Sequence, residues 1–137
     1  MKRQEPIENV MSPRVMTVDI GDKLSSVRRI LLDGSFHHVP ILNGPKLVGI
    51  ISSRDMLKLS FDLSDISEGA ADESTDKNFS IEQVMAKEVV TIDRGDSVET
   101  AIDLLARGKF HSLPVVDNDG HLEGIVTSID LLEFLMS

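Results

Sequence analysis

The sequence predicts a mixed α/β (α+β) fold made of two pseudo-symmetric β-α-β-β-α units packed sheet to sheet. Three observations lead to this prediction. The chain repeats itself at an offset of about 74 residues. In each copy, apolar residues spaced i, i+3, i+4 and i+7 indicate a helix lying on a sheet. Each copy then has two short apolar stretches joined by turn-forming residues, which is typical of a hairpin.

The two copies align over most of their length. Gly34–Pro40 matches Gly108–Pro114, and Gly49–Asp55 matches Gly124–Asp130, with one extra residue in the turn before the second motif. We expect a first domain at 6–59, an acidic and flexible linker at 60–79, and a second domain at 80–137. One copy has too few residues to bury its apolar faces well alone, so we expect the two copies to share a core.

Each copy is predicted to open with a short helical turn, at 7–11 or 81–85. Ser80 and Gln83 have the spacing of a capping box, in which both side chains bond to the backbone at a helix start. A short β-branched strand follows, at 15–18 or 89–92.

The next helix of each copy carries the apolar stripe. Asp22 and Asp96 are its expected N-caps, and Gly34 and Gly108 its expected left-handed C-caps. The stripe consists of Leu24, Val27, Ile30 and Leu31 in the first copy, and Val98, Ala101, Ile102 and Leu105 in the second.

A hairpin and a final helix complete each copy. The hairpin strands are expected at 37–42 and 46–52, then at 111–116 and 121–127. The turns between them contain Gly44-Pro45 and Asp119-Gly120, which are turn-forming pairs. The final helices are expected at 53–59 and 128–136.

The amino-acid composition argues against several classes of function. The net charge of −9 argues against general nucleic-acid binding, which relies on Lys and Arg to neutralise phosphates. The absence of Cys excludes disulfides and thiolate metal sites. No apolar run approaches the roughly 18 residues of a membrane span, and the first residues lack the apolar segment of a signal peptide. We therefore expect a cytoplasmic location.

Two hydroxyl–carboxylate pairs, Ser52 with Asp55 and Thr127 with Asp130, recur where an apolar strand is followed by a helix. Backbone N–H groups at a helix start are unpaired and favour a phosphate, while the carboxylate suits ribose hydroxyls. The alternative is that Ser52 and Thr127 are only N-caps. The recurrence in matching contexts favours a ligand site.

With its twofold Phe-His-x-hydrophobic-Pro and Gly-Ile-hydrophobic-Ser/Thr-x-x-Asp motifs, the chain resembles a tandem pair of cystathionine-β-synthase (CBS) domains, or Bateman module. The resemblance covers about Pro6–Leu59 and Ser80–Met136. It implies a stand-alone regulatory module that is not an enzyme and requires no cofactor. Such a module binds AMP, ADP, ATP or S-adenosylmethionine between its repeats, signals to a protein partner by conformational change, and usually forms a homodimer.

Carried over by motif, the resemblance implies that Asp55 and Asp130 hold ribose and that Ser52 and Thr127 contact phosphate. Arg54 can add a fork of donors to a phosphate, whereas Ile129 at the matching position cannot. The alternative is that Arg54 is only a solvated surface residue. The residues implied to surround adenine are Val15, Met16, Thr17, Val39 and Pro40, with Val89, Val90, Thr91, Leu113 and Pro114 in the second copy.

Other interpretations stay open or are disfavoured. An interaction module that works by dimerisation, with vestigial ligand sites, is the main alternative. A nucleotide-processing enzyme lacks a visible base or metal cluster, so no catalytic residue is assigned. His37 and His38 are adjacent and point to opposite faces of a strand, which disfavours a metal site. The carboxylate pairs Asp19–Asp22 and Asp93–Asp96 fit caps and turns better than acid–base catalysis.

Overall fold

The structure is a computed structural model that describes residues 1–60, 73, 75–108 and 110–137. Most of the linker predicted at 60–79 lies outside these residues. None of the helices in the described part of the chain is long and apolar enough to cross a membrane.

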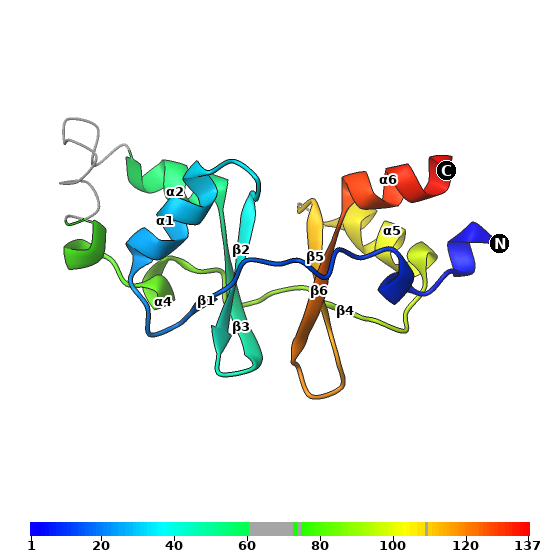
Figure 1. Cartoon of the computed structure of the whole chain (residues 1–137), viewed down its shortest axis with the longest axis horizontal. Coiled ribbons are helices and arrows are strands. Elements are labelled where there is room, and N and C mark those ends of the chain that lie inside the picture. Colours follow the sequence, from blue (N-terminus) through cyan, green and yellow to red (C-terminus); the bar gives the residue numbers. More distant parts are fainter. Residues whose placement is uncertain (61–72, 74, 109) are drawn as a thin grey trace. The chain divides into compact units, whose positions relative to one another are not determined.

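Each sequence repeat forms the β-α-β-β-α order predicted for it (Figure 1). The first repeat contains β1 (Val18–Asp19), α1 (Leu24–Leu32), β2 (His38–Asn43), β3 (Lys46–Ser52) and α2 (Ser53–Ser60). The second contains β4 (Ile92–Asp93), α5 (Val98–Arg107), β5 (Ser112–Val116), β6 (Leu122–Thr127) and α6 (Ser128–Met136). The short helices η1 (Lys2–Gln4), η2 (Ile7–Asn9) and α4 (Ile81–Val84) precede the repeats or open them.

The two sheets have the same topology. Their strand orders are β1-β2-β3 and β4-β5-β6, with the first pair parallel in each. The registers also match, since Val18 lies opposite Ile41 and Ile92 opposite Val115. These features confirm the predicted α/β class and the two pseudo-symmetric repeats.

The chain forms two compact units that exchange segments between the repeats. The unit built on the first sheet contains residues 16–44 and 48–89, and we call it the Asp55 unit. The unit built on the second sheet contains residues 1–15, 45–47 and 90–137, and we call it the Asp130 unit. The repeats predicted at 6–59 and 80–137 therefore do not coincide with the compact units.

In the Asp130 unit, the exchanged segment is the opening turn of the first repeat. Ile7 is fully buried in a core formed with residues of the second repeat. Ser12 and Ile125 exchange two backbone hydrogen bonds, Ser12 N–H to Ile125 O at 2.8 Å and Ile125 N–H to Ser12 O at 2.9 Å. This turn thus contributes an apolar side chain to the core of the other repeat and pairs with the edge strand of its sheet.

The Asp55 unit receives the matching segment of the second repeat. Ile81 and Met85 are buried in its core. Ala86 and Ile50 exchange backbone hydrogen bonds of 2.9 and 3.1 Å. The Ser80–Gln83 capping box forms as predicted and starts α4. The two cores consist of Val18, Leu24, Val27, Val39, Ile41, Ile51, Ile81 and Met85 in this unit, and Ile7, Ile92, Val98, Ala101, Leu113, Val115, Val126 and Leu131 in the other.

The N-caps predicted at Asp22 and Asp96 are wrong by one residue. Both carboxylates instead accept a backbone N–H three residues earlier, from Asp19 and Asp93, at 3.1 Å. The acidic pairs therefore close turns, as the turn interpretation predicted. The N-cap of α5 is Ser97, whose hydroxyl accepts the Thr100 N–H.

The start of α1 is capped from a distance. Its N-cap residue Lys23 makes no capping hydrogen bond. Asp76 supplies one instead, because its carboxylate accepts the Ser25 N–H at 2.8 Å and the Ser25 hydroxyl at 2.7 Å. A residue from the predicted linker thus orders a helix of the first repeat.

Two further predictions need correction. Gly34 has the expected positive φ of 84°, but Gly108 has an extended backbone with φ −92°, so it is not a left-handed cap. The first strands begin later than predicted at 15 and 89, because their pairing is limited to two residues each. Met16 and Thr17 precede β1 with exposed side chains.

Candidate functional site

The two predicted hydroxyl–carboxylate pairs form matching capping boxes at the starts of α2 and α6. Ser52 N–H donates to Asp55 Oδ2 at 2.8 Å, and Asp55 N–H donates to Ser52 Oγ at 3.2 Å. The corresponding distances for Thr127 and Asp130 are 2.9 and 3.1 Å. The N-cap interpretation thus describes what both hydroxyls do in the folded chain.

The residue after each hydroxyl ties the helix start to the neighbouring strand. Ser53 donates its N–H to the His37 carbonyl oxygen at 2.9 Å and its hydroxyl to the same oxygen at 3.2 Å. Ser128 repeats both bonds to His111 with the same distances. Each strand-to-helix corner is therefore held rigidly by four hydrogen bonds, and these histidines take part through their backbone.

One oxygen of each carboxylate stays available to a ligand. Asp55 and Asp130 use Oδ2 in the capping box, while Oδ1 accepts no hydrogen bond from the described residues. Both side chains are half-buried, so solvent reaches them. A fixed carboxylate with one unused oxygen can accept hydrogen bonds from one or two hydroxyl groups.

The neighbours of the two carboxylates differ in charge. Arg54 follows the Ser52–Ser53 pair with an exposed side chain, and Ile129 takes its place in the second repeat, where it is 61% exposed. The hydroxyl hydrogens of Ser52 and Thr127 remain able to donate, because these oxygens act as acceptors in the capping boxes.

The residues implied to surround adenine have very different environments. Val39, Pro40, Leu113 and Pro114 are buried within strands, and Val39 and Leu113 are part of the two cores. The remaining ones are exposed in the case of Met16, Thr17 and Val90, and half-buried in the case of Val15, Val89 and Thr91. The buried side chains offer no surface to a ligand within their own units, and their role in binding stays a prediction.

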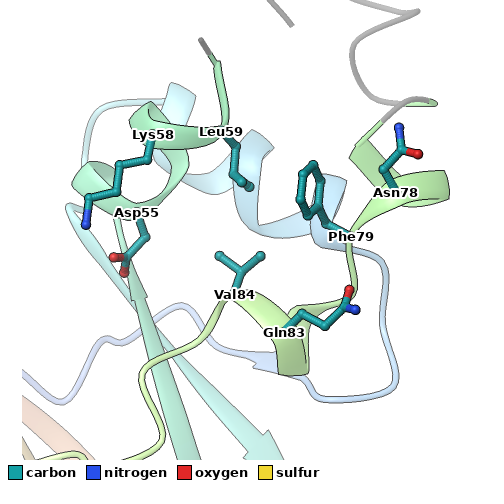
Figure 2. A pocket seen from close by; sticks show the side chains of 7 residues that line it. All are labelled: Asp55, Lys58, Leu59, Asn78, Phe79, Gln83 and Val84. Atoms are coloured by element: carbon teal, nitrogen blue, oxygen red, sulfur yellow. The ribbon is translucent and has the colours of Figure 1, made fainter. Parts of the chain in front are cut away.

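A pocket of about 430 Å³ lies beside Asp55, between α2 and the segment around α4 (Figure 2). Its lining residues are Asp55, Lys58 and Leu59 from α2, together with Asn78, Phe79, Gln83 and Val84. Of the site residues predicted from the sequence, Asp55 alone lines this pocket.

The sequence contains a signal for this pocket. Phe79 precedes the N-cap Ser80, and Val84 is four residues beyond that cap. These positions are those of a hydrophobic staple, in which two apolar residues bracket a helix start. Both side chains pack against the core of the Asp55 unit and also face the pocket.

The turn between β5 and β6 holds a group of three potential metal ligands, Asp117, Asp119 and His121. Their contacts are those of a turn, since Asp117 Oδ1 accepts the N–H groups of Asp119 at 2.8 Å and His121 at 2.9 Å. The His121 N–H is the main cause that lowers the pKa of Asp117, with the Asp119 N–H and the His121 ring adding to it. The Asp117 carboxylate is therefore engaged in hydrogen bonds within the turn.

Comparison with known proteins identifies both repeats. The family model for the CBS domain matches residues 7–62 and 81–137. A CBS domain-containing protein of Dictyostelium discoideum is 30% identical over 132 residues, which are 95% of this chain and 90% of that protein. An uncharacterized protein of Methanocaldococcus jannaschii is 29% identical over 133 residues, and an inosine-5′-monophosphate dehydrogenase of Thermoplasma acidophilum is 26% identical over 132. The chain spans 47% and 24% of these last two proteins.

Solved structures show the same fold. The CBS domain of a membrane protein from Sphaerobacter thermophilus superimposes with a TM-score of 0.75 at 31% identity, covering 97% of this chain and 89% of that one. The Arabidopsis thaliana protein CBSX2, crystallised with AMP, gives 0.79 at 24% identity and 96% coverage of both chains. A CBS domain pair crystallised with 5′-methylthioadenosine and S-adenosyl-L-methionine gives 0.78 at 24% identity, again covering 96% of both chains.

Proposed function

We infer that this chain, which belongs to the CBS-domain family and carries two CBS domains in tandem, is a regulatory module that senses adenosine-containing ligands. The observation that carries the proposal is the pair of rigid corners, each with an Asp oxygen unused by the described residues. A carboxylate held in this way is preorganised for the two adjacent hydroxyls of a ribose, so little ordering cost is added when the ligand binds.

The chemistry around the first corner suits a phosphate beside the ribose. The Ser52 hydroxyl can donate to a phosphate oxygen while it accepts the Asp55 N–H. Arg54 is one residue from Asp55 and can add a bidentate, charge-assisted contact. The positive end of the α2 dipole favours an anion in the same place.

The choice among AMP, ADP, ATP and S-adenosylmethionine rests on analogy. Structurally similar CBS proteins have been crystallised with AMP and with S-adenosyl-L-methionine. These complexes support an adenosine ligand for this chain too. Binding would then favour one conformation over another, and a partner protein that reads this change would be regulated by it.

An interaction module is the second candidate, and one surface favours it. Along α6, Ile129, Leu132 and Met136 are 61%, 54% and 84% exposed. They follow one another at helical spacing and form an apolar stripe that another copy of the chain could cover. In this reading the chain forms a homodimer whether or not a ligand is present.

A thermal-shift series with paired variants separates the two candidates. At 100 times its dissociation constant, a ligand that binds only the folded state raises the free energy of unfolding by about 2.7 kcal/mol. We expect such a rise in melting temperature with at least one of AMP, ADP, ATP and S-adenosylmethionine. Asp55→Ala should weaken the ribose-containing ligand much more than free adenine, because adenine has no hydroxyls to bond.

The absence of any ligand-induced shift would favour the interaction module. If all four ligands at millimolar concentration leave the melting temperature unchanged while light scattering gives the mass of a dimer, the interaction module replaces the sensor. Leu132→Lys is the matched variant for that case, since a charge in the α6 stripe should dissociate the dimer.

A further inference from the structure

Residues 75–79 of the Asp55 unit, which we call the strap, contact two separate parts of that unit. At one end of the strap, Asp76 accepts the backbone N–H and the hydroxyl of Ser25 at the start of α1. At the other end, Phe79 lines the pocket that Asp55 also lines from α2 (Figure 2). The strap therefore connects the wall of this pocket to the first turn of α1.

The first turn of α1 depends on the strap because its own N-cap residue cannot cap it. This residue is Lys23, whose ammonium group donates hydrogen bonds and accepts none. The Asp76 carboxylate supplies the missing acceptor for the Ser25 N–H at 2.8 Å. Its negative charge also suits the positive end of the α1 dipole. The order of this helix start is therefore tied to the position of the strap.

The equivalent helix of the second repeat caps itself. By the repeat offset, Ser97 corresponds to Lys23. The Ser97 hydroxyl accepts the Thr100 N–H at 3.2 Å at the start of α5. This helix start is therefore capped by a residue adjacent to it in the chain.

The segment that corresponds to the strap is also bound differently in the Asp130 unit. Lys2 corresponds to Asp76 and has the opposite charge. The Lys2 ammonium lies 3.3 Å from the Phe134 carbonyl oxygen and 3.4 Å from that of Leu135, at the end of α6. A cation is favoured at the end of a helix, as an anion is at its start. The link between a preceding segment and the start of the next helix is thus a feature of the Asp55 unit.

The strap contains one group that opposes its own burial. Thr75 is fully buried, and its hydroxyl oxygen has no hydrogen-bond partner among the described residues. Burying an unpaired hydroxyl costs free energy, which offsets part of what the Asp76 hydrogen bonds and the packing of Phe79 contribute. The Phe79 N–H donates to the Thr75 carbonyl oxygen at 2.9 Å, so exchange of this N–H reports on whether the strap is closed.

We propose, resting on the adenosine-sensing function above, that the strap transmits occupation of the Asp55 site to the start of α1. A ligand held by Asp55 contacts the Phe79 end of the strap and favours its closed position. The Asp76 end then keeps the first turn of α1 ordered. Without ligand, the strap and this turn open together more often. Asp76 is thus a positioning residue that acts on the ligand site through Phe79, and the start of α1 is the element whose order reports binding.

Amide hydrogen exchange of the full chain, followed by NMR with and without AMP, tests this coupling. If calorimetry shows that ADP, ATP or S-adenosylmethionine binds more tightly, that ligand replaces AMP. A ligand that binds only the closed form, at 100 times its dissociation constant, slows exchange through strap opening by up to about 100-fold. We expect this slowing at the N–H groups of Ser25 and Phe79. The Thr100 N–H of the self-capped α5 is the matched control and should exchange at an unchanged rate.

Two variants of the strap should change the exchange rate of the Phe79 N–H in opposite directions. Asp76→Ala should raise it about fivefold, the equivalent of one lost helix cap, although this N–H bonds to Thr75 and not to Asp76. Thr75→Val removes the unpaired hydroxyl while keeping the side-chain shape, and should lower the rate.

Lys23→Ser separates the capping of α1 from the closing of the strap, because it gives α1 the N-cap residue of α5. Combined with Asp76→Ala, it should restore protection of the Ser26 N–H, which corresponds to the N–H that Ser97 caps in α5. It should not restore protection of the Phe79 N–H. Restoration at Phe79 as well would overturn the role given to Asp76.

The outcomes separate this proposal from the broader function. Ligand-induced slowing at Ser25 and Phe79, with faster exchange at Phe79 in Asp76→Ala, supports both. Ligand binding that slows Ser25 no more than Thr100 overturns the coupling and leaves the sensing function standing. The same conclusion follows if the Phe79 N–H does not respond to Asp76→Ala or exchanges faster in Thr75→Val. A wild type that binds none of AMP, ADP, ATP and S-adenosylmethionine overturns both.

Discussion

The corner at Ser52–Asp55 and the corner at Thr127–Asp130 have the same backbone and different surroundings. Their four hydrogen bonds agree within 0.1 Å, at 2.8, 3.2, 2.9 and 3.2 Å in one and 2.9, 3.1, 2.9 and 3.2 Å in the other. The capping box is therefore a structural feature common to both repeats. We therefore expect any difference in ligand binding between the two corners to come from side chains outside these hydrogen bonds, such as Arg54 and its counterpart Ile129.

The largest difference expected between the two halves concerns the glycine that opens each motif. A Cβ at Gly124 would lie 2.7 Å from the Ser12 carbonyl oxygen, which is fixed by its bond to Ile125. A Cβ at Gly49 would meet the Met85 side chain first, which can move, and the Ala86 carbonyl oxygen at 3.1 Å.

We therefore expect Gly124→Ala to reduce the free energy of unfolding by about 1–3 kcal/mol, as overpacking does, and Gly49→Ala to reduce it less. Urea unfolding of the two variants measures the difference. Equal losses would show that the exchanged segments are seated equally tightly in the two units.

The capping boxes provide a test in which no difference is expected. Ser52→Ala and Thr127→Val each remove the side-chain oxygen that accepts the N–H of an Asp. Each should reduce the free energy of unfolding by about 1 kcal/mol, the usual cost of losing an N-cap. A loss confined to one variant in urea unfolding would break the equivalence of the two corners.

The smallest expected effect is a pH dependence of stability that differs between the two hairpin turns, β2 to β3 and β5 to β6. Asp117 ionises in the second turn, whereas Asn43 at the matching position of the first cannot. Hydrogen bonding from His121 lowers the pKa of Asp117 below its ordinary value of 3.8, so folding favours the carboxylate. Its stabilisation is complete above that ordinary value and is lost as the pH falls through the lowered pKa of the folded state.

Asp117→Asn makes the second turn resemble the first and removes this dependence. The stability difference between the wild type and this variant, followed by urea unfolding from about pH 7 downward, should stay constant and then shrink below the ordinary pKa. A difference that grows on acidification would contradict the direction assigned to Asp117.

Features set by neighbouring residues could be predicted from the sequence. β3 and α6 begin and end where expected, because a hydroxyl three residues before an Asp marks the change from strand to helix. The Ser80–Gln83 capping box was likewise predictable. Asp22 was misassigned as an N-cap because the Asp-x-Gly-Asp turn competes for the same carboxylate.

Features that depend on distant segments could not be predicted in the same way. Repeat alignment shows that 7–11 and 81–85 are equivalent, but not which sheet each one covers. The cap that Asp76 supplies to Ser25 joins residues that are 51 positions apart. The pocket beside Asp55 could not be predicted for the same reason, since four of its seven lining residues come from 78–84, where the predicted linker ends and the second repeat begins.

The exchanged opening turns mean that neither repeat is self-sufficient. A polypeptide ending after α2 would keep Ile7, which belongs in the other core, and would lack Ile81 and Met85 from its own. Such a half-protein could fill this gap only by borrowing the turn of a second molecule. Because both repeats lie in one chain, each core receives the opening turn of the other repeat from the same molecule. Dilution therefore cannot separate a core from the turn that completes it.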